Sequence, residues 1–494
     1  MLLGVDIGTT NLKILAIDAN SLQLVAHTAR PVATLSPKPD YAEQDPEVIW
    51  RLFLDAMQEM LAVNDVATGS IDGLCFSTAM HSLLAVDDAG KPLTNALIWS
   101  DNRVSAEAGL LKKDHADLYK IIGVPIHPML PLCKLMWFNR TNPRLLKRAA
   151  RWLSIKEYIW WKLTGRYEID YATAAATGLF DAKKNAWYVP ALTLAGVRVD
   201  QLSTPVNTIH RADYEGLKVI INGLAIYTPL IIGASDGCLA NLGAGAIEAG
   251  ITTITIGTSG AVRRSSPRPI RDGQGRLFSY PLYRNEAPSH QTYPVRQGDC
   301  YAVGGPTNNG ANVLEWVAQK FANIPIPDVL MQVANVPAGA DGLLFRPYLH
   351  GERAPLWDAT VRGSFHHVDW QHTQAHFMRA ALEGVLFNLR EIDLLLSRHT
   401  GPTRVIHANG GFAQSAVWVQ MMADVFGVPV RLNASNESSA IGAVLLARFA
   451  LAAGSPEPVS LGEMANQITF GNTYLPDPDR HKTYLNAFKM FASL

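Results

Sequence analysis

The chain carries two copies of one short pattern, and these copies constrain its fold more than any other feature. The first runs from Leu3 to Thr10 and the second from Thr253 to Gly260; in each, an apolar strand stops at a glycine followed by hydroxyl residues. Glycine lets a backbone turn tightly and approach a ligand, and hydroxyls and N–H groups can converge there on anionic oxygens. Either copy alone is better explained as an ordinary strand end. Together, with Asp6 in the first, they predict two phosphate-binding turns in a chain of two similar halves.

Composition excludes several kinds of partner. The 494 residues include 43 Lys+Arg and 43 Asp+Glu, so there is no net charge to attract a nucleic acid or an anionic membrane. A hydrophobic fraction of 48% allows a large core. Four scattered cysteines without metal-ligand spacing favour free thiols in a reducing cytoplasm. We therefore expect a cytoplasmic protein of two or three domains that binds neither nucleic acid nor membrane.

Strand and helix signals alternate along the chain, which is typical of an α/β fold. Strands are predicted over residues 2–7, 12–17 and 22–27, and a helix begins at Pro46 after the N-cap Asp45. Helical periodicity also covers residues 373–397 and 437–453. We place a boundary near residue 244, which gives an N-terminal domain over 1–244, a C-terminal domain over 245–494 and a ligand cleft between them.

Asp236 is the strongest candidate for a catalytic group. It interrupts an apolar run that begins at Ile231, and a lone carboxylate there is costly unless it has a partner or a role. Phosphoryl transfer to an alcohol requires a group that accepts the hydroxyl proton and orients the oxygen. Asp236 fits this role. The alternative is that Ser235 or Asp236 only caps a helix, and one residue can do both.

Asp6 stands at the end of an apolar strand, where a hydrated Mg²⁺ that bridges phosphates would offset its charge. It is otherwise a turn-stabilising residue. Lys13 lies one strand away and is equally consistent with a phosphate ligand and with a solvated strand residue. His372 and His376 have helical spacing but no glutamate between them, so a polar helix start explains them better than a metal site.

Polar side chains also follow two later predicted strands. Met80 and His81 come after the strand that ends at Ser77, and Trp99, Asp101 and Arg103 follow another. Because α/β proteins bind ligands at strand ends, these groups suit a polyhydroxylated ligand, although each alone is more often a surface loop residue.

Two glycine pairs offer further space for a ligand. Gly410 and Gly411 stand between a strand end and a helix start, where N–H groups can meet an anion and missing side chains leave room for a flat base. The segment from Gly304 to Gly310 is similarly permissive. Both are also explained as hinges or helix starts.

Taken together, these segments resemble the FGGY family of carbohydrate kinases, a part of the actin-like ATPase clan. Residues 6–13 and 255–260 are similar to the clan's two phosphate loops, and Met129–Phe138 is similar to the family's first signature. Asp236 lies where the family carries its catalytic aspartate. The resemblance covers nearly the whole chain and implies an α/β fold of two ribonuclease-H-like (actin-like ATPase) domains with an inter-domain cleft.

The resemblance also implies a set of ligand contacts. ATP would be held by Gly8, Thr9, Thr10, Asn11, Lys13, Gly257, Thr258, Ser259, Gly310, Gly410, Gly411, Phe412 and Ser415. The sugar would be held by Met80, His81, Trp99, Asp101, Arg103, His127, Met129 and Asp236. Asp236 would act as the base, and Asp6 would hold Mg²⁺ directly or through water.

Within the family, the chain is most similar to members that phosphorylate the 6-hydroxyl of D-gluconate to give 6-phosphogluconate. The carboxylate of a sugar acid needs a cation, and Arg103, His127 and Lys134 are equal candidates. A loop over residues 284–297 is longer than expected for these members. The alternatives are a kinase for another polyol or ketose, such as xylulose or glycerol, and a non-catalytic nucleotide switch. A homodimer is compatible with the sequence.

Overall fold

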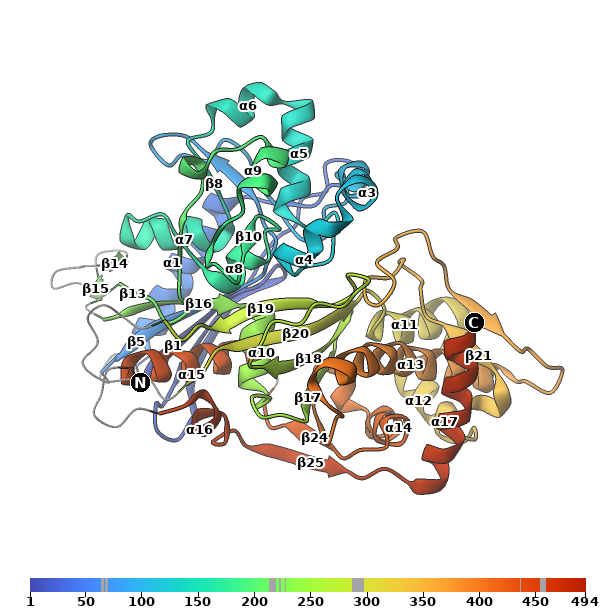
Figure 1. Cartoon of the computed structure of the whole chain (residues 1–494). Helices are drawn as coiled ribbons and strands as arrows, with labels where there is room; N and C mark the ends of the chain where they lie inside the picture. The colour runs from blue at the N-terminus through green and yellow to red at the C-terminus, as the bar shows by residue number, and fades with distance from the viewer. Residues whose placement is uncertain are drawn as a thin grey trace.

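The computed structural model describes residues 1–63, 66, 70–212, 219–221, 224–226, 228–286, 297–435, 437–453 and 459–494. Figure 1 shows two groups of elements, one from the first half of the chain and one from the second, which meet along a central seam. Within the described residues, no helix combines the length and the apolar composition that crossing a bilayer requires.

A six-stranded sheet organises the first half, in the order β13-β16-β5-β1-β2-β3. Its strands are β1 (Leu2–Ile7), β2 (Asn11–Ile17), β3 (Leu24–Pro31), β5 (Gly73–Thr78), β13 (Arg211–Ala212) and β16 (Leu230–Ser235). β1 pairs antiparallel with β2 and parallel with β5, and β5 pairs parallel with β16. The three parallel strands therefore end at one edge of the sheet.

Shorter strands and the helices complete this half. The strands are β4 (Glu43–Gln44), β6 (Leu84–Val86), β7 (Ala96–Leu97), β8 (Arg151–Leu153), β9 (Glu168–Asp170), β10 (Phe180–Asp181), β11 (Ala186–Trp187), β12 (Thr204–Val206), β14 (Val219–Ile221) and β15 (Leu224–Ile226). The helices are α1 (Pro46–Ala62), α3 (Ser105–Asp114), α4 (Tyr119–Ile122), α5 (Pro131–Thr141), α6 (Pro143–Arg148), α7 (Ile155–Thr164), α8 (Tyr171–Ala175), α9 (Val189–Ala195) and α10 (Asp236–Gly243).

The predicted start of the chain is confirmed, with one difference in length. The α1 helix begins at Pro46, and Asp45 caps it by accepting from the N–H groups of Glu47 and Val48. The third strand begins at Leu24, two residues later than predicted. The side chain of Asp18 accepts hydrogen bonds from the next residues, which extends the turn that precedes β3.

The second half repeats the strand pattern of the first in a seven-stranded sheet, in the order β19-β20-β18-β17-β23-β24-β25. As around β1, one strand pairs antiparallel across a glycine turn, here β17 with β18, and parallel on its other side, here with β23. The strands are β17 (Ile251–Ile256), β18 (Gly260–Ser266), β19 (Phe278–Tyr283), β20 (Cys300–Thr307), β23 (Val405–Asn409), β24 (Val430–Asn433) and β25 (Phe470–Tyr474), with β21 (Leu344–Arg346) and β22 (Ser364–His366) forming a separate pair.

The helices of this half are α11 (Ala311–Trp316), α12 (Ile326–Ala334), α13 (Gln374–Thr400), α14 (Ala416–Phe426), α15 (Ser438–Ala452), α16 (Leu461–Ala465) and α17 (Pro478–Ser493). The predicted helices over residues 373–397 and 437–453 are confirmed as α13 and α15. One helix crosses the seam, because α15 packs on β1, β5 and α10 of the first half (Figure 1). The two halves are thus joined by packed apolar surface as well as by the chain.

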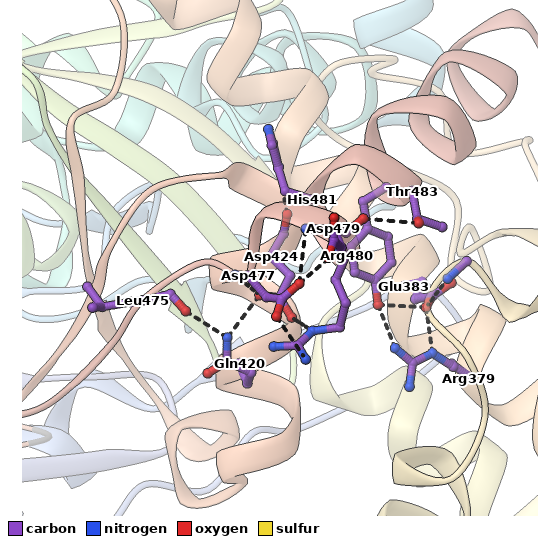
Figure 2. Close-up of polar contacts among 12 residues, drawn as sticks. Arg379, Glu383, Gln420, Asp424, Leu475, Asp477, Asp479, Arg480, His481 and Thr483 are labelled. Carbon is purple, nitrogen blue, oxygen red and sulfur yellow. Dashed lines mark hydrogen bonds and ion pairs between the residues drawn. The ribbon is translucent and has the colours of Figure 1, made fainter.

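A buried polar network fixes the last helix, α17, against α13 and α14 (Figure 2). The Tyr484 hydroxyl donates to Glu383 at 2.8 Å and accepts from Arg379 at 2.7 Å. Arg480 donates from Nε to Asp424 at 2.6 Å. Because Tyr484 and Glu383 are buried, these polar groups depend on one another for their hydrogen bonds.

Tyr484→Phe should therefore destabilise the protein by about 1–3 kcal/mol, since it removes one partner from each of two buried charged groups. Urea unfolding measures the change. Tyr474→Phe is the matched control, because within the described residues the Tyr474 hydroxyl has no hydrogen bond. An equal loss in both variants would contradict the role given to the network.

Candidate active site

A cavity of about 370 Å³, here called the central cavity, opens between the two halves. The first half contributes Thr10, Met80, His81, Trp99, Met129 and Asp236. The second half contributes Thr255, Gly257, Thr258, Ser259, Gly260, Ala261, Arg263, Phe278, Tyr280, Pro306 and Arg353. The structure therefore brings together part of each predicted phosphate turn, the predicted base and four of the predicted sugar contacts.

Asp6 and Asp236 come close together because their strands end at the same edge. Asp6 on β1 pairs with Ser77 on β5, and Ser77 in turn pairs with Ala234 on β16, two residues before Asp236. Ser77 donates to Asp6 at 2.7 Å, and Ser439 of α15 donates to it at 3.2 Å. Burial, together with the nearby Asp236 charge, raises the pKa of Asp6 from its usual 3.8 to about 6.

Asp236 is the first residue of α10. Ser235, rather than Asp236, provides the helix cap by accepting from the N–H of Cys238. Burial raises the pKa of Asp236, whereas the Arg263 charge, the N–H of Gly237 and the Lys156 charge act to lower it. Burial therefore disfavours the ionised form of the Asp236 carboxyl group unless a cation or a hydrogen-bond donor lies near it.

A buried ion pair supports the strand end that carries Asp236. Lys156 contacts Asp170 at 2.7 Å and also donates to the carbonyl of Ala234 at 3.1 Å. Both charged side chains are nearly inaccessible to solvent. This pair fixes the backbone just before the predicted base.

The second glycine turn is packed so closely that its neighbours must also be glycines. A Cβ at Gly310 would lie 2.6 Å from the carbonyl oxygens of Gly257 and Ser259. Gly410 has φ +100°, and a Cβ there would lie 2.4 Å from the oxygen of Ile256. Both predicted nucleotide contacts therefore lie against the second turn.

Thr10, Gly257, Thr258 and Ser259 line the central cavity. The remaining predicted nucleotide contacts fall outside the residues that line it: Gly8, Thr9, Asn11, Lys13, Gly411, Phe412 and Ser415. Gly411 is exposed, Phe412 is buried against Trp418, and Ser415 caps α14. In the first turn, Gly8 donates its N–H to the carbonyl of Asn11, and the Thr9 carbonyl accepts from Gln44. Lys13 contacts Glu437 of the second half at 2.7 Å.

One end of the central cavity, here called the sugar end because the predicted sugar contacts Met80, His81, Trp99 and Met129 line it, is built around a neutral imidazole. Burial, helped by the nearby Lys134 charge, lowers the pKa of His81 to about 3. Its Nδ1 lies 2.8 Å from the carbonyl of Ala176, so Nδ1 carries the proton and Nε2 remains an acceptor. His81 has φ +69°, a strained conformation that often marks a functional position.

Three other predicted residues lie behind this surface. Asp101 and Arg103 form a buried cluster with Glu43, in which Arg103 also covers the Tyr41 ring. The His127 ring packs edge-on against Trp357, at 5.5 Å between centroids. None of the three lines the central cavity, so their contact with a ligand stays a prediction.

Lys134 is fully buried and donates to three backbone carbonyls, those of His81, Leu97 and Ile98. These bonds use all three of its N–H donors and leave none for a ligand. Lys134 instead ties the loop of His81 to the strand end that precedes Trp99.

Sequence reasoning missed the two cations of the cavity, Arg263 and Arg353. Arg353 donates to Asn308 at 2.7 Å and to the carbonyl of Thr307 at 2.9 Å, and its guanidinium lies 5.2 Å from the centre of the Trp99 ring. Burial lowers the pKa of Arg353 to about 10, which still leaves it charged at neutral pH. The sequence signal for Arg353 was the segment Gly351–Trp357, which resembles the gluconate-phosphorylating members of the family.

Most of the predicted long loop, over residues 284–297, lies outside the described residues.

His376, one of the two histidines with helical spacing, contacts Asp341 at 3.0 Å. The described residues hold no cluster of three or more His, Cys, Asp or Glu side chains that could form a metal site. Asp6 and Asp236, close to both turns, instead fit a hydrated Mg²⁺ held largely by phosphates, since that ion keeps several waters and uses one or two carboxylates.

Comparisons with known proteins agree on one family. Residues 1–243 match the N-terminal domain, and residues 252–451 the C-terminal domain, of the FGGY family of carbohydrate kinases. The chain is 38% identical over 510 residues to a gluconokinase of Bacillus licheniformis, covering 100% of this chain and 95% of the relative.

Two solved structures from Lactobacillus acidophilus superimpose with a TM-score of 0.90 and 31% identity, over 100% of this chain. One is a gluconate kinase, 96% covered, and the other a ligand-bound xylulose kinase, 97% covered. The prediction of two ribonuclease-H-like, actin-like domains is confirmed.

Asp6→Asn should stabilise the ligand-free protein at neutral pH. Because the pKa of Asp6 is raised in the folded state to about 6, its ionisation costs stability progressively as pH rises from about 4 to 6, and the full cost remains above pH 6. A pKa raised from 3.8 to about 6 corresponds to roughly 3 kcal/mol, so the melting temperature of this 494-residue variant should exceed that of the wild type by about 2–4 °C at pH 7.5.

The two melting temperatures should converge near pH 4, as measured by differential scanning fluorimetry. Asp18→Asn is the control, because Asp18 is exposed and its pKa is shifted downward by hydrogen bonds from Ser21. A wild type that is the more stable protein at pH 7.5 would refute the assignment.

Proposed function

We propose that this chain, which belongs to the FGGY family of carbohydrate kinases, transfers the terminal phosphoryl group of ATP to the 6-hydroxyl of D-gluconate. The observation that carries the proposal is the presence of Asp236 and two partly buried arginines, Arg263 and Arg353, around one cavity. A neutral ketose has no charge for the second arginine to bind, whereas a sugar acid does. The similarity to gluconokinases supports the same choice.

Arg353 is the cation that we assign to the gluconate carboxylate. It stands at the end of the cavity that holds Trp99 and interacts electrostatically with His81 and His127. Its planar guanidinium can make paired hydrogen bonds to a carboxylate. This assignment replaces the three sequence candidates. Lys134 is committed to carbonyls and Arg103 to Asp101 and Glu43, and burial lowers the pKa of His127 well below its usual value, which leaves it uncharged.

Neutral His81 would accept a hydrogen bond from a sugar hydroxyl at Nε2, and the Trp99 ring would lie against carbon-bound faces of the sugar. Asp236 would accept the proton of the 6-hydroxyl as the hydroxyl oxygen bonds to the terminal phosphorus of ATP. The bond from phosphorus to the oxygen that bridges to ADP then breaks, and the electron pair stays on ADP.

The phosphates of ATP would receive hydrogen bonds from the two glycine turns, through Thr9, Thr10, Thr258 and Ser259. Asp6 would hold Mg²⁺ directly or through water, and that ion would neutralise charge on the phosphates. The four cysteines are buried and unpaired, which suits the reducing cytoplasm that we propose as the compartment.

We place the domain boundary between Ala244 and Gly245, just after α10 ends at Gly243. The two family domains match on either side of this point, up to residue 243 and from residue 252. By this division the base and the neutral sugar contacts belong to the N-terminal domain, and both arginines belong to the C-terminal domain.

A sugar panel with coupled ADP detection tests the substrate. We expect kcat/KM for D-gluconate to exceed that for D-xylulose and glycerol by at least about 100-fold, a difference of about 2.7 kcal/mol. Phosphorus NMR of the product should show phosphate at the 6-position. A xylulose kinase is the second candidate, because the two solved neighbours match equally well; faster turnover of D-xylulose would make it the function.

Asp236→Asn should lower kcat below one per cent of wild type while ATP affinity changes by less than about threefold, because the amide cannot accept the hydroxyl proton. Steady-state kinetics and ATP calorimetry give the two numbers. The control is Asp200→Asn at an exposed site, which should leave both unchanged. Turnover above one per cent in the Asp236 variant would exclude it as the base.

A further inference from the structure

Two neighbouring arginines on β18 have opposite environments. Arg264 points away from the central cavity, is 1% exposed, and donates to a ring of acceptors that includes Asp393, Ser397 and Thr403. Arg263 lines the cavity. Because successive side chains of a strand point to opposite faces, one arginine serves the core and the other faces the site.

Arg263 has few partners for a partly buried cation. Among the described residues its one hydrogen bond joins Nη1 to Thr255 at 3.5 Å, the outer limit of such a bond, and its buried Nε has no partner there. Within the described part of the chain, no ion pair within 4 Å joins it to Asp236 or to any other acid. A buried donor without an acceptor costs about 1–3 kcal/mol, so the free enzyme holds this guanidinium in an unfavourable state.

The position of Arg263 identifies the anion that it awaits. On one side it contacts Thr255, two residues before the second glycine turn. On the other it lies over Gly237, where an added Cβ would approach Nε to 3.3 Å and Nη2 to 3.6 Å. The guanidinium thus spans the space between the second phosphate turn and the residue that follows the base, while Arg353 occupies the sugar end.

We propose that Arg263 is a further catalytic residue, whose guanidinium contacts the phosphoryl group in transit between ATP and the sugar hydroxyl. The inference rests on the proposed phosphoryl transfer, but not on which sugar accepts it. As the bond to ADP breaks and the bond to the sugar oxygen forms, negative charge shifts over the transferred oxygens and the departing ADP oxygen. The N–H donors of Arg263 that are unused in the free enzyme stabilise that charge.

The test compares Arg263→Met with Arg353→Met. For Arg263→Met we expect kcat to fall about 100- to 1000-fold, with the calorimetric Kd for D-gluconate within threefold of wild type. For Arg353→Met we expect the opposite, a gluconate Kd raised at least tenfold and a smaller loss of kcat. Arg268→Met, at an exposed arginine five residues along the chain, is the matched control and should change neither quantity.

Arg263→Lys and Gly237→Ala keep the proposal testable if Arg263→Met does not fold. The lysine keeps the charge and should recover at least tenfold in kcat over the methionine variant. The alanine Cβ would lie 3.2 Å from the Met80 methyl and 3.3 Å from the Arg263 Nε, so it displaces the guanidinium by a few tenths of an ångström without removing it. This variant should lower kcat about tenfold. Melting temperatures identify any variant whose loss comes from unfolding.

Two results would overturn the inference: a kcat within threefold of wild type in a folded Arg263→Met, or a gluconate Kd raised tenfold with kcat retained. If the sugar panel selects another substrate, the same measurements are made on that sugar. The proposed substrate then fails while the role of Arg263 is still decided by its own kcat.

Discussion

The parallel pairing of β1, β5 and β16 is the constraint on which the rest of the site depends. Two carboxylates repel each other and lose solvation when they are brought together, and burial alone raises the pKa values of both Asp6 and Asp236. The strand register holds them there nonetheless, because the sheet is stabilised by its whole buried surface. The core thus holds two acidic side chains close together at one edge of the sheet, and this edge therefore attracts cations.

Local signals predicted the parts of the site that depend on local chemistry. The glycine turns, the cap at Asp45 and the lone acid at Asp236 could each be recognised because a few consecutive residues determine them. Their relative placement depends on the parallel pairing of β1, β5 and β16, which only the structure shows. The family resemblance supplied the roles of residues such as His81, which the sequence pattern alone left as a loop residue.

The cations of the site could not be predicted in this way. Arg263 and Arg264 are adjacent and chemically identical in sequence, and only the orientation of β18 in its sheet decides which one faces the cavity. Lys134 seemed available for a carboxylate, yet its partners are carbonyls 36 to 53 residues away in the chain. Lys13 was equally consistent with two roles, and its partner Glu437 lies in the other half of the chain. Long-range contacts of this kind leave no periodic trace in the sequence.

In the proposed reaction the two halves would contribute different chemistry. The first would supply the acids and the neutral sugar contacts, held rigid by Lys134 and by the Lys156–Asp170 pair. The second supplies the positive charge of Arg263 and Arg353. Any change in the angle between the halves therefore alters the electrostatics of the base, because the guanidinium that lowers the pKa of Asp236 belongs to the opposite half.

The start of α15 extends this dependence to the first phosphate turn. Ser439 donates to Asp6, and Glu437 pairs with Lys13, so the second half contacts both charged residues of the turn. The Lys13–Glu437 pair is about one-third exposed on both sides, and such pairs contribute only about 0–1 kcal/mol. A phosphate carries more charge than one carboxylate, so it can displace Glu437 from Lys13 at little cost. The pair therefore holds Lys13 near the turn without preventing the lysine from binding a nucleotide.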